Sequence, residues 1–496
     1  MSMRQTIVLV FFVALFIVVP VFASAETRSL WLGVSGSDVV ELQNKLISGG
    51  YLAVGKNTGY FGPLTEAAVK KFQCEKNILC SGASVSGYGV YGPKTQTAFL
   101  GETPVVVTQQ PSSVHGKWLT GPATGSFEIS GWVPDWRAAS GTQDVLPHLD
   151  KMSSVLPFGY KVSSSGRLID NARITEEPWP SFIAAAKAKG VRVIPTVVWG
   201  DGQNIHEILS DTTKRIALED EIAAMVKENG FDGVDIDFEA KQARTINYFS
   251  TFLKGLYQRM GNKWVYCTVE ARMPLEDRYS HGATIPPDAT DYANDYAAMN
   301  KYCDRVEIMA YDQGTISVRL NAARSAPYAP VADPGWVENL VTLAGQSISR
   351  NKLIIGVPTY GYEYLVTPLG SGGFQYKMLW AFNPKYATDI ATKLGITPYR
   401  TSANEMGFIY DPARLAAIAP AGNDSTQIQH QNTPAITVAQ NLGSQVNTSQ
   451  PFNYVTWSDA RAIKDKVDLA HRLGVRGVAV FSLGGAEDQA MWNILK

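Results

Sequence analysis

The stretch FDGVDIDFEA, residues 231–240, places four carboxylic acids within eight positions and separates them with mostly apolar residues. Alternate side chains of a β-strand point to the same face, so Asp235, Asp237 and Glu239 project together while the apolar residues between them face the other side. Burying three carboxylates on one face is costly unless they share protons and hydrogen bonds, and their repulsion raises at least one pKa. Such a strand is expected to carry a catalytic acid.

This stretch is the fourth of eight short apolar runs that alternate with amphipathic helical segments. The runs are FEISGW (127–132), SSVLPFGY (153–160), VRVIPTVVW (191–199), GVDIDFE (233–239), WVYCTVEA (264–271), RVEIMAY (305–311), KLIIGVP (352–358) and RGVAVFS (476–482). Buried strands that alternate with helices favour parallel βαβ units, and eight of them favour a (β/α)8 TIM barrel of the α/β class over a doubly wound sheet. In a barrel the acids would line the interior, with Glu239 at the carboxyl end where active sites form.

The chain is longer than such a barrel requires. Barrels typically have about 250 residues, and the surplus falls mainly at residues 361–457, which we expect to form an α+β insertion between strands seven and eight. Residues 126–496 are therefore assigned to the barrel domain. Residues 101–125, a mixture of Pro, Thr, Ser, Gln and Gly, are expected to be an exposed linker.

Residues 29–100 contain an internal repeat, in which GYFGPLTEAAVKKFQ (59–73) returns as GVYGPKTQTAFL (89–100). Each copy has a glycine turn followed by a proline that suits the first turn of a helix. A further helix is expected in SDVVELQNKLISGGY (37–51), where Val39, Leu42 and Leu46 share a face. We therefore expect a small three-helix module before the linker.

Residues 1–25 have the pattern of a secretory signal peptide. One Arg precedes the apolar run IVLVFFVALFIVV, and Ala23 and Ala25 form an A-x-A-like cleavage site. An uncleaved N-terminal membrane anchor is the alternative. Both lead us to expect a protein that is secreted or associated with the cell envelope.

Composition and cysteine spacing indicate which partners, disulfides and metals to expect. A formal net charge of −1 over 496 residues gives no electrostatic reason to expect nucleic acid as a partner. Cys74 and Cys80 are expected to form a disulfide, whereas Cys267 and Cys303 suit buried thiols as well as a bridge. The acidic stretch contains no His, so we expect neither a metal nor a cofactor. No obligate protein partner is evident, and we expect a monomer.

DGVDIDFE (232–239) fits the D-x-x-D-x-D-x-E signature of family 18 glycoside hydrolases, the chitinase-like enzymes. LPFGY (156–160), IMAYD (308–312) and LIIGVPTYGY (353–362) are similar to that family's segments on strands two, six and seven. The tail at 454–485 resembles the spore-germination, cell-wall-lytic branch. Residues 29–100 resemble the peptidoglycan-binding type 1 module, with a generic three-helix interaction domain as the alternative.

The resemblance implies a catalytic role for each acid. Glu239 would protonate the glycosidic oxygen, and Asp237 would orient the substrate's N-acetyl group for its attack on the anomeric carbon. Asp235 would hold Asp237 through a shared proton. This substrate-assisted retaining route is an exception to the two-carboxylate scheme. The implied substrate is a β-linked N-acetylglucosaminyl bond of peptidoglycan; chitin or chitooligosaccharide hydrolysis and non-catalytic, lectin-like glycan binding are the alternatives.

The resemblance also implies contacts to the sugar. Tyr311 and Asp312 would bind the acetamido group, although a strand-end tyrosine followed by a helix-capping aspartate would give the same sequence. The family's usual tryptophan at the end of strand eight is Phe481 here, which leaves a smaller face for stacking. The other candidate substrate-binding residues are Met309, Phe158 and Trp136, with Trp199 suiting either a sugar platform or plain packing.

The remaining expectations concern structure around the acidic strand. Asp232 and Gly233 are assigned to the base of the strand as structural members of the motif. Glu270 and Arg272, which follow the fifth run, are expected to form a solvated salt bridge at the rim of the barrel.

Overall fold

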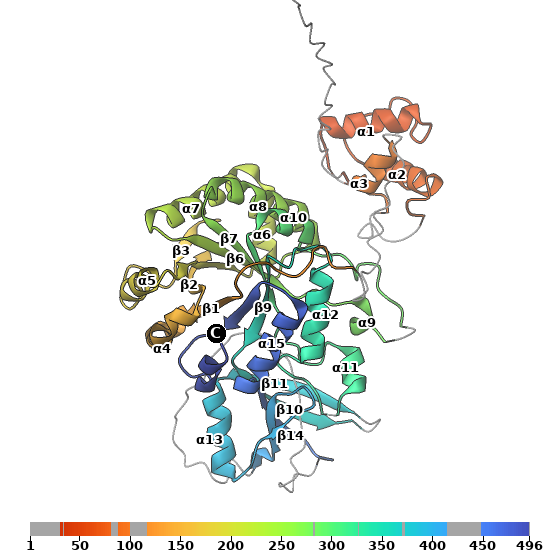
Figure 1. Cartoon of the computed structure of the whole chain (residues 1–496). Helices are drawn as coiled ribbons and strands as arrows, with labels where there is room; N and C mark the ends of the chain where they lie inside the picture. The colour runs from red at the N-terminus through yellow and green to blue at the C-terminus, as the bar shows by residue number, and fades with distance from the viewer. Residues whose placement is uncertain are drawn as a thin grey trace, which may run out of the picture. The chain divides into compact units, whose positions relative to one another are not determined.

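The computed structural model describes residues 30–32, 34–80, 88–99, 117–280, 283–325, 327–369, 373–413 and 448–495 (Figure 1). The chain divides into two units, Met1–Thr108 and Gln109–Lys496. The expected signal segment, 1–25, lies outside the described residues. Within the described ranges, no helix has the length and apolar character needed to span a membrane.

The N-terminal unit is helical, as the repeat predicts. Its helices are α1 (Ser37–Ser48), α2 (Pro63–Glu75) and α3 (Pro93–Phe99). The side-chain amide of Gln43 accepts from the backbone N–H of Gly59 at 2.9 Å, and that of Gln73 accepts from Gly89 at 2.8 Å. Each glutamine also donates to the threonine at the start of the following helix. The two copies of the repeat are therefore closed by the same hydrogen bonds.

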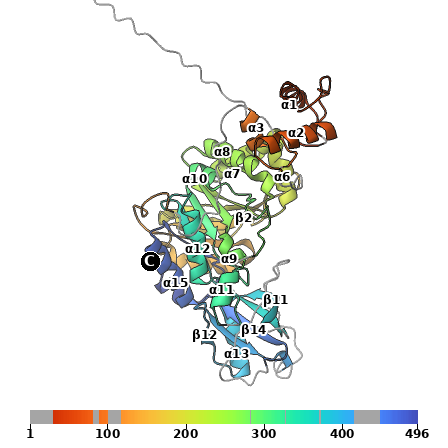
Figure 2. The same cartoon turned by 90° about the vertical axis from the view of Figure 1, so that its right-hand side faces the viewer.

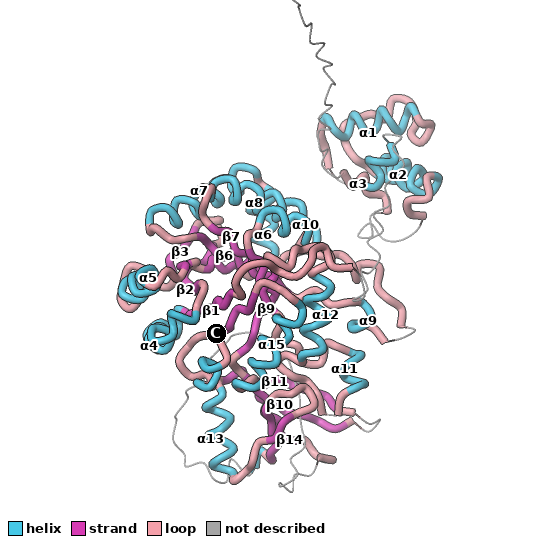
Figure 3. Tube along the Cα trace, in the orientation of Figure 1, coloured by secondary structure: helices cyan, strands magenta, loops and turns pink. Residues whose placement is uncertain are grey.

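Eight parallel strands of the second unit form a closed barrel (Figure 3). The strands are β1 (Glu128–Pro134), β2 (Ser154–Val162), β5 (Thr196–Trp199), β6 (Gly233–Phe238), β7 (Trp264–Glu270), β8 (Arg305–Met309), β9 (Leu353–Pro358) and β15 (Gly477–Phe481). β1 pairs in parallel with both β2 and β15, which closes the sheet. The predicted (β/α)8 barrel is confirmed and the doubly wound alternative is wrong.

The third predicted strand is divided in two. β4 (Arg192–Val193) and β5 are separated by Ile194 and Pro195, and proline has no N–H to donate to the sheet. A short strand, β3 (Leu168–Asp170), adds an antiparallel hairpin to the end of β2.

Helices surround the barrel strands (Figures 1 and 2). They are α4 (Ala138–Val145), α5 (Trp179–Ala188), α6 (Gly202–Ser210), α7 (Thr212–Glu228), α8 (Ile246–Met260), α9 (Leu275–Arg278), α10 (Tyr296–Tyr302), α11 (Val318–Ala323), α12 (Pro334–Ala344) and α15 (Ala460–Leu473). Short 3-10 turns lie at Asp135–Arg137, Leu146–Lys151, Ala243–Thr245 and Gln489–Asn493. The outward face of β6 packs on α8, where the rings of Phe238 and Phe252 lie 5.3 Å apart, as the alternation of the strand predicts.

The expected insertion lies between barrel strands β9 and β15. It contains β10 (Gly361–Pro368), β11 (Phe374–Phe382), α13 (Pro384–Leu394), β12 (Tyr399–Arg400), β13 (Met406–Tyr410) and β14 (Phe452–Trp457). The strands form an antiparallel sheet in the order β11-β10-β14-β13-β12, with α13 packed on it (Figure 2). Buried Glu363 on β10 ties the sheet to α13 by accepting from the hydroxyl of Tyr386 at 2.7 Å, and it also accepts from the amide of Asn453 on β14 at 2.7 Å.

The end of the segment expected to be an exposed linker is packed against the barrel unit. The guanidinium of Arg350 lies 3.7 Å from the ring centre of Trp118, and the backbone N–H of Leu119 donates to Gly345 at 2.8 Å. The backbone N–H of Thr124 donates to the side chain of Asn351 at 2.8 Å. Residues 117–125 are therefore a strap on the barrel, because Trp118 covers apolar surface and the backbone finds partners there.

Disulfides join Cys74 to Cys80 and Cys267 to Cys303. The second bridge connects β7 to the residue that ends α10, next to β8. Sequence alone left Cys267 and Cys303 open between thiols and a bridge, and the structure has the bridge.

Candidate active site

Asp235 lies inside the barrel with both carboxylate oxygens hydrogen-bonded. The indole N–H of Trp132 donates to it at 3.1 Å, and the hydroxyls of Thr196 and Thr268 each donate at 2.8 Å. Complete burial raises the pKa of Asp235, and these three donors oppose that rise. Its donors come from β1, β5 and β7, so closure of the barrel builds this environment.

Asp237 is almost as buried as Asp235, but its hydrogen bonding is different. It is 4% exposed, and its Oδ1 has no hydrogen-bond partner among the described residues. Burial, followed by the negative charges of Glu239 and Asp235, raises the pKa of Asp237 well above its usual range. The acidic strand therefore keeps a proton to higher pH than an isolated aspartate would, next to an oxygen available to a ligand.

Glu239 follows the last residue of β6, at the carboxyl end of the barrel. Its backbone N–H donates to the carbonyl of Trp199 at 2.8 Å, which continues the β5–β6 ladder by one residue. Burial, with the negative charges of Glu270 and Asp312, raises the pKa of Glu239, while Lys241 opposes the rise. A carboxyl that stays protonated to higher pH is suited to act as an acid.

Glu270 pairs with a lysine and not with Arg272, contrary to the expected salt bridge. The ammonium of Lys241 lies 3.5 Å from Oε2 of Glu270. The guanidinium of Arg272 lies 3.7 Å from the ring centre of Tyr292 and 4.1 Å from that of Tyr296. Stacking between two aromatic rings turns the arginine away from the carboxylate.

Tyr311 and Asp312 follow β8 at the same end of the barrel. Asp312 has φ +60°, in the left-handed region, and accepts from the hydroxyls of Tyr360 and Tyr362. It does not cap the next helix, α11, which begins after Ser317. Tyr311 is buried, and burial together with nearby carboxylates raises the pKa of its hydroxyl well above the usual value.

The aromatic candidates differ in how far their rings are exposed to solvent. Phe481 is half-buried and lies in parallel with Tyr311 at 5.5 Å between ring centres. Trp136 is 44% exposed, with its ring perpendicular to that of half-buried Phe158 at 5.7 Å. Trp199 is 4% exposed and packs in the core, so packing is its role. The remaining candidate, at the end of β8, is half-buried Met309.

The base of β6 is held by the two motif residues assigned to it. The carboxylate of Asp232 accepts from the backbone N–H of Val193 at 2.8 Å, which ties β6 to β4. A Cβ on Gly233 would lie 2.3 Å from the carbonyl oxygen of Trp264, so the strands can approach here only with glycine.

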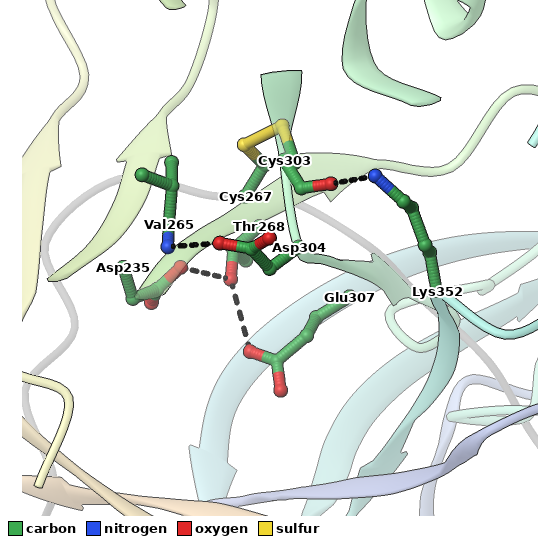
Figure 4. The surroundings of a disulfide bond; sticks show 8 residues. All are labelled: Asp235, Val265, Cys267, Thr268, Cys303, Asp304, Glu307 and Lys352. Carbon is green, nitrogen blue, oxygen red and sulfur yellow. Dashed lines mark hydrogen bonds between the residues drawn. A yellow bond between two sulfur atoms is a disulfide. The ribbon is translucent and has the colours of Figure 1, made fainter. Parts of the chain in front are cut away.

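Glu307 adds a fourth carboxyl to those of Asp235, Asp237 and Glu239, and the sequence did not lead us to expect it. It lies on β8 and accepts from the hydroxyl of Ser130 at 2.7 Å. The hydroxyl of Thr268 lies 3.4 Å from its other oxygen (Figure 4). The Thr268 hydroxyl thus stands between Glu307 and Asp235. Burial and then the charge of Asp235 raise the pKa of Glu307 well above its usual value. The feature of the sequence that could have revealed Glu307 is a single acidic residue within the apolar run RVEIMAY.

The side chains gathered at this site are carboxyls, hydroxyls and aromatic rings. Among the described residues, no group of three or more His, Cys, Asp or Glu side chains is arranged to hold a metal ion. Acids on the inner face of a barrel strand, ending in Glu239 at the carboxyl end, can transfer protons to a bound substrate.

Comparison with known proteins identifies the family. The model "Glycosyl hydrolases family 18" matches residues 137–486, and "Putative peptidoglycan binding domain" matches residues 35–98. Uncharacterized glycosylase YvbX of Bacillus subtilis (strain 168) is 22% identical over 296 residues, 60% of this chain and 70% of that protein. The chain spans about half the length of other curated relatives that it matches.

Solved structures share the fold. The spore cortex-lytic enzyme SleL of Bacillus megaterium QM B1551 aligns with a TM-score of 0.53 at 18% identity, covering 76% of this chain and 74% of that one. A chitinase from Chromobacterium violaceum ATCC 12472 aligns with a TM-score of 0.52 at 18% identity, covering 75% and 98%. Because the first family model covers well over half of the chain, this protein belongs to glycosyl hydrolase family 18.

Proposed function

We propose that this protein is an exported glycosidase that cleaves β-linked N-acetylglucosaminyl bonds of peptidoglycan by a substrate-assisted, retaining mechanism. The observation that carries the proposal is the presence, in one chain, of a family 18 barrel with an intact acidic strand and a module that matches the peptidoglycan-binding family at residues 35–98. Export rests on the signal-like pattern of residues 1–25.

In the first step Glu239 donates its proton to the glycosidic oxygen, and the bond between that oxygen and the anomeric carbon breaks. The carbonyl oxygen of the substrate's own N-acetyl group attacks the anomeric carbon from the opposite side and forms a cyclic oxazolinium ion. The raised pKa of Glu239 supports its role as the acid. Both oxygens of Asp235 accept hydrogen bonds from other barrel strands, and the carboxyl is fully buried, which suits a supporting role better than that of a nucleophile.

Asp237 is proposed to orient and polarise the N-acetyl group during this step. Its Oδ1 is buried without a partner in the described part of the chain, and an amide N–H is the donor such an oxygen would accept. Asp235 supports Asp237 through a shared proton. Tyr311 and Asp312 are proposed to contact the same acetamido group from the end of β8.

In the second step the carboxylate of Glu239 takes a proton from a water molecule. The resulting hydroxide adds to the anomeric carbon, and the acetamido group is released. Two displacements at one carbon retain its configuration. Glu239 ends the cycle protonated again, so protons balance over the reaction.

We propose peptidoglycan as the substrate in place of chitin because of the N-terminal module. The name of SleL, a spore cortex-lytic enzyme, agrees with that choice, whereas the Chromobacterium neighbour is a chitinase. The barrel fold is common to both neighbours, so the module carries the preference.

The test is digestion of purified peptidoglycan and of chitin oligosaccharides side by side, with Glu239→Gln as the inactive control. New reducing ends are reduced with borohydride and identified by mass spectrometry. N-acetylglucosaminitol from peptidoglycan is the expected product. N-acetylmuramitol would overturn the proposed bond, faster cleavage of chitin would favour the chitinase alternative, and glycan binding without cleavage would favour a lectin-like protein.

A further inference from the structure

The backbone turns sharply immediately after Glu239. Ala240 has φ +53°, a conformation that is unfavourable for a residue with a Cβ. Its N–H donates to Oε1 of Glu270 at 2.6 Å. Its carbonyl lies so close to Gly202 that a Cβ there would be 1.9 Å from the oxygen. The turn is therefore held by a carboxylate on one side and by close backbone packing on the other.

Beyond the turn, the side chain of Lys241 is buried close to the carboxyls of the site. Its side chain has no solvent exposure, and its Nζ forms no hydrogen bond within the described residues. The nearest charge partner is Oε2 of Glu270 at 3.5 Å, and the ring centre of Phe249 lies 4.8 Å away. Asn294 donates to the same Oε2 at 3.1 Å and holds that carboxylate in place.

A buried ammonium with one distant partner is costly to retain. A lysine whose role was only to fill space could be replaced by an apolar side chain of the same length without that cost. Such a charge is found where it acts on neighbouring titratable groups. The titratable groups that act on Lys241 in this structure are carboxyls, among them the proposed catalytic acid.

We propose that Lys241 and Glu270 are a positioning pair for the acid of the reaction. Glu270 holds the turn after Glu239, and Lys241 places a buried positive charge beside Glu239 and Asp237. Together they set the pH range in which Glu239 can donate its proton. This inference rests on the proposed role of Glu239.

The charges around Glu239 act in opposite directions. Lys241 lowers the pKa of Glu239, and Glu270 and Asp312 raise it. Glu270, Asp237 and Glu239 favour the charged form of Lys241, against the larger effect of its burial. The groups that act on this cluster are Asp235 and Asp237 from β6, Glu270 from the end of β7, and Tyr311 and Asp312 from beyond β8.

The experiment measures initial rates against pH at low substrate concentration for wild type, Lys241→Met and Glu270→Gln. Peptidoglycan is the substrate, because an activated synthetic leaving group would not need the acid. The basic limb of this profile reports the pKa of the acid in the free enzyme. Lys241→Met removes a positive charge and should move the limb upward, and Glu270→Gln removes a negative charge and should move it downward. We expect shifts of about half a pH unit or more in each direction.

The opposite signs separate this role from a structural one. Loss of support for the turn alone would reduce the rate at every pH without moving the limb. Lys254→Met, an exposed lysine on α8, is the matched control and should leave the limb in place. Because Lys241→Met could impair folding, Lys241→Gln is tested with it and thermal unfolding is recorded for each variant. Unmoved limbs, or limbs that move in the same direction, would overturn the inference.

The test can fail independently of the proposed function. If Glu239→Gln retains wild-type turnover, then the assignment of the acid is wrong and this inference falls with it. If Glu239→Gln is inactive while Lys241→Met and Glu270→Gln keep the wild-type limb, then only the positioning pair is wrong. The double variant Lys241→Met/Glu270→Gln should return close to the wild-type limb, since the two charges are removed together.

Discussion

The indole N–H of Trp132 donates a hydrogen bond to the carboxylate of Asp235 at 3.1 Å, across the interior of the barrel. This contact joins the first barrel strand to the fourth, and it belongs to a set of three donors that gives each oxygen of Asp235 a partner. Asp237, two residues further along the strand, keeps one oxygen without a partner among the described residues. The two aspartates differ in environment although the sequence presents them as equivalent.

Replacement of Trp132 by Phe should lower the free energy of unfolding and raise the pKa of Asp235. The variant loses one hydrogen bond to a charged or partly charged group, which contributes about 1.5–3 kcal/mol to stability. Loss of a donor should also raise the pKa of Asp235, because that hydrogen bond lowers it. Urea unfolding of wild type and variant measures the first effect. An unchanged free energy of unfolding would mean that the contact does not form.

Glu239→Gln should reduce hydrolysis by at least about 10²–10⁴-fold, the range attributed to a general acid, while binding of the glycan persists. The amide has nearly the same shape but cannot donate a carboxyl proton. Glu228→Gln on the exposed end of α7 is the matched control and should keep wild-type rates. Turnover of peptidoglycan by the Glu239 variant at the wild-type rate would remove this residue from the mechanism.

Glu307→Gln should stabilise the fold increasingly as pH rises. The folded state raises the pKa of Glu307 well above the ordinary 4.5, so the folded chain holds a proton that the unfolded chain releases. Wild-type stability therefore falls as pH rises from about 4.5 toward the folded value, by up to about 1.4 kcal/mol per pH unit, and stays reduced above it. The amide side chain of the variant cannot ionise, so the variant avoids that loss.

The measurement compares free energies of unfolding of wild type and Glu307→Gln at pH 4 and at pH 8. The advantage of the variant should be larger at pH 8. A difference that is the same at both pH values would show that Glu307 ionises alike in the folded and unfolded chain. Glu228→Gln again provides the exposed control.

The regular parts of this fold could be predicted from local patterns. Each barrel strand is a short apolar run, and DGVDIDFE shows by its alternation alone which face carries the acids. Chemistry that converges from distant strands could not be predicted in this way. Trp132, Thr196 and Thr268 meet Asp235 only after closure of the barrel sets the register of strands far apart in sequence.

Two other features of the site, the burial of Lys241 and the partner of Arg272, could not be predicted for different physical reasons. In the sequence Lys241 looks like an ordinary solvated lysine, whereas in the structure it follows the turn at Ala240 and its side chain is buried against Glu270. Arg272 was expected to pair with Glu270 from their spacing, but the spacing does not reveal the rings of Tyr292 and Tyr296, which attract the guanidinium elsewhere.

Deletion of residues 26–100 should weaken retention on cell-wall sacculi and spare cleavage of soluble oligosaccharides. The barrel strands and the acidic strand lie within residues 126–496, so the chemistry does not require the module. A pull-down with insoluble sacculi measures retention, and product release from a soluble oligosaccharide measures cleavage. Equal retention of the truncated and full-length proteins would remove the anchoring role of the module.

Phe481→Leu should raise KM more than it lowers kcat. Phe481 is half-buried and lies against Tyr311, so part of its ring can still contact a sugar. Loss of an aromatic contact costs about 0.5–1.5 kcal/mol, or roughly a 2- to 12-fold weaker interaction. Trp136→Leu is the comparison, since Trp136 is 44% exposed in the 3-10 turn that follows β1. A larger effect on KM at one position identifies the more important sugar platform, and a fall in kcat alone at Phe481 would instead place this ring in the chemical step.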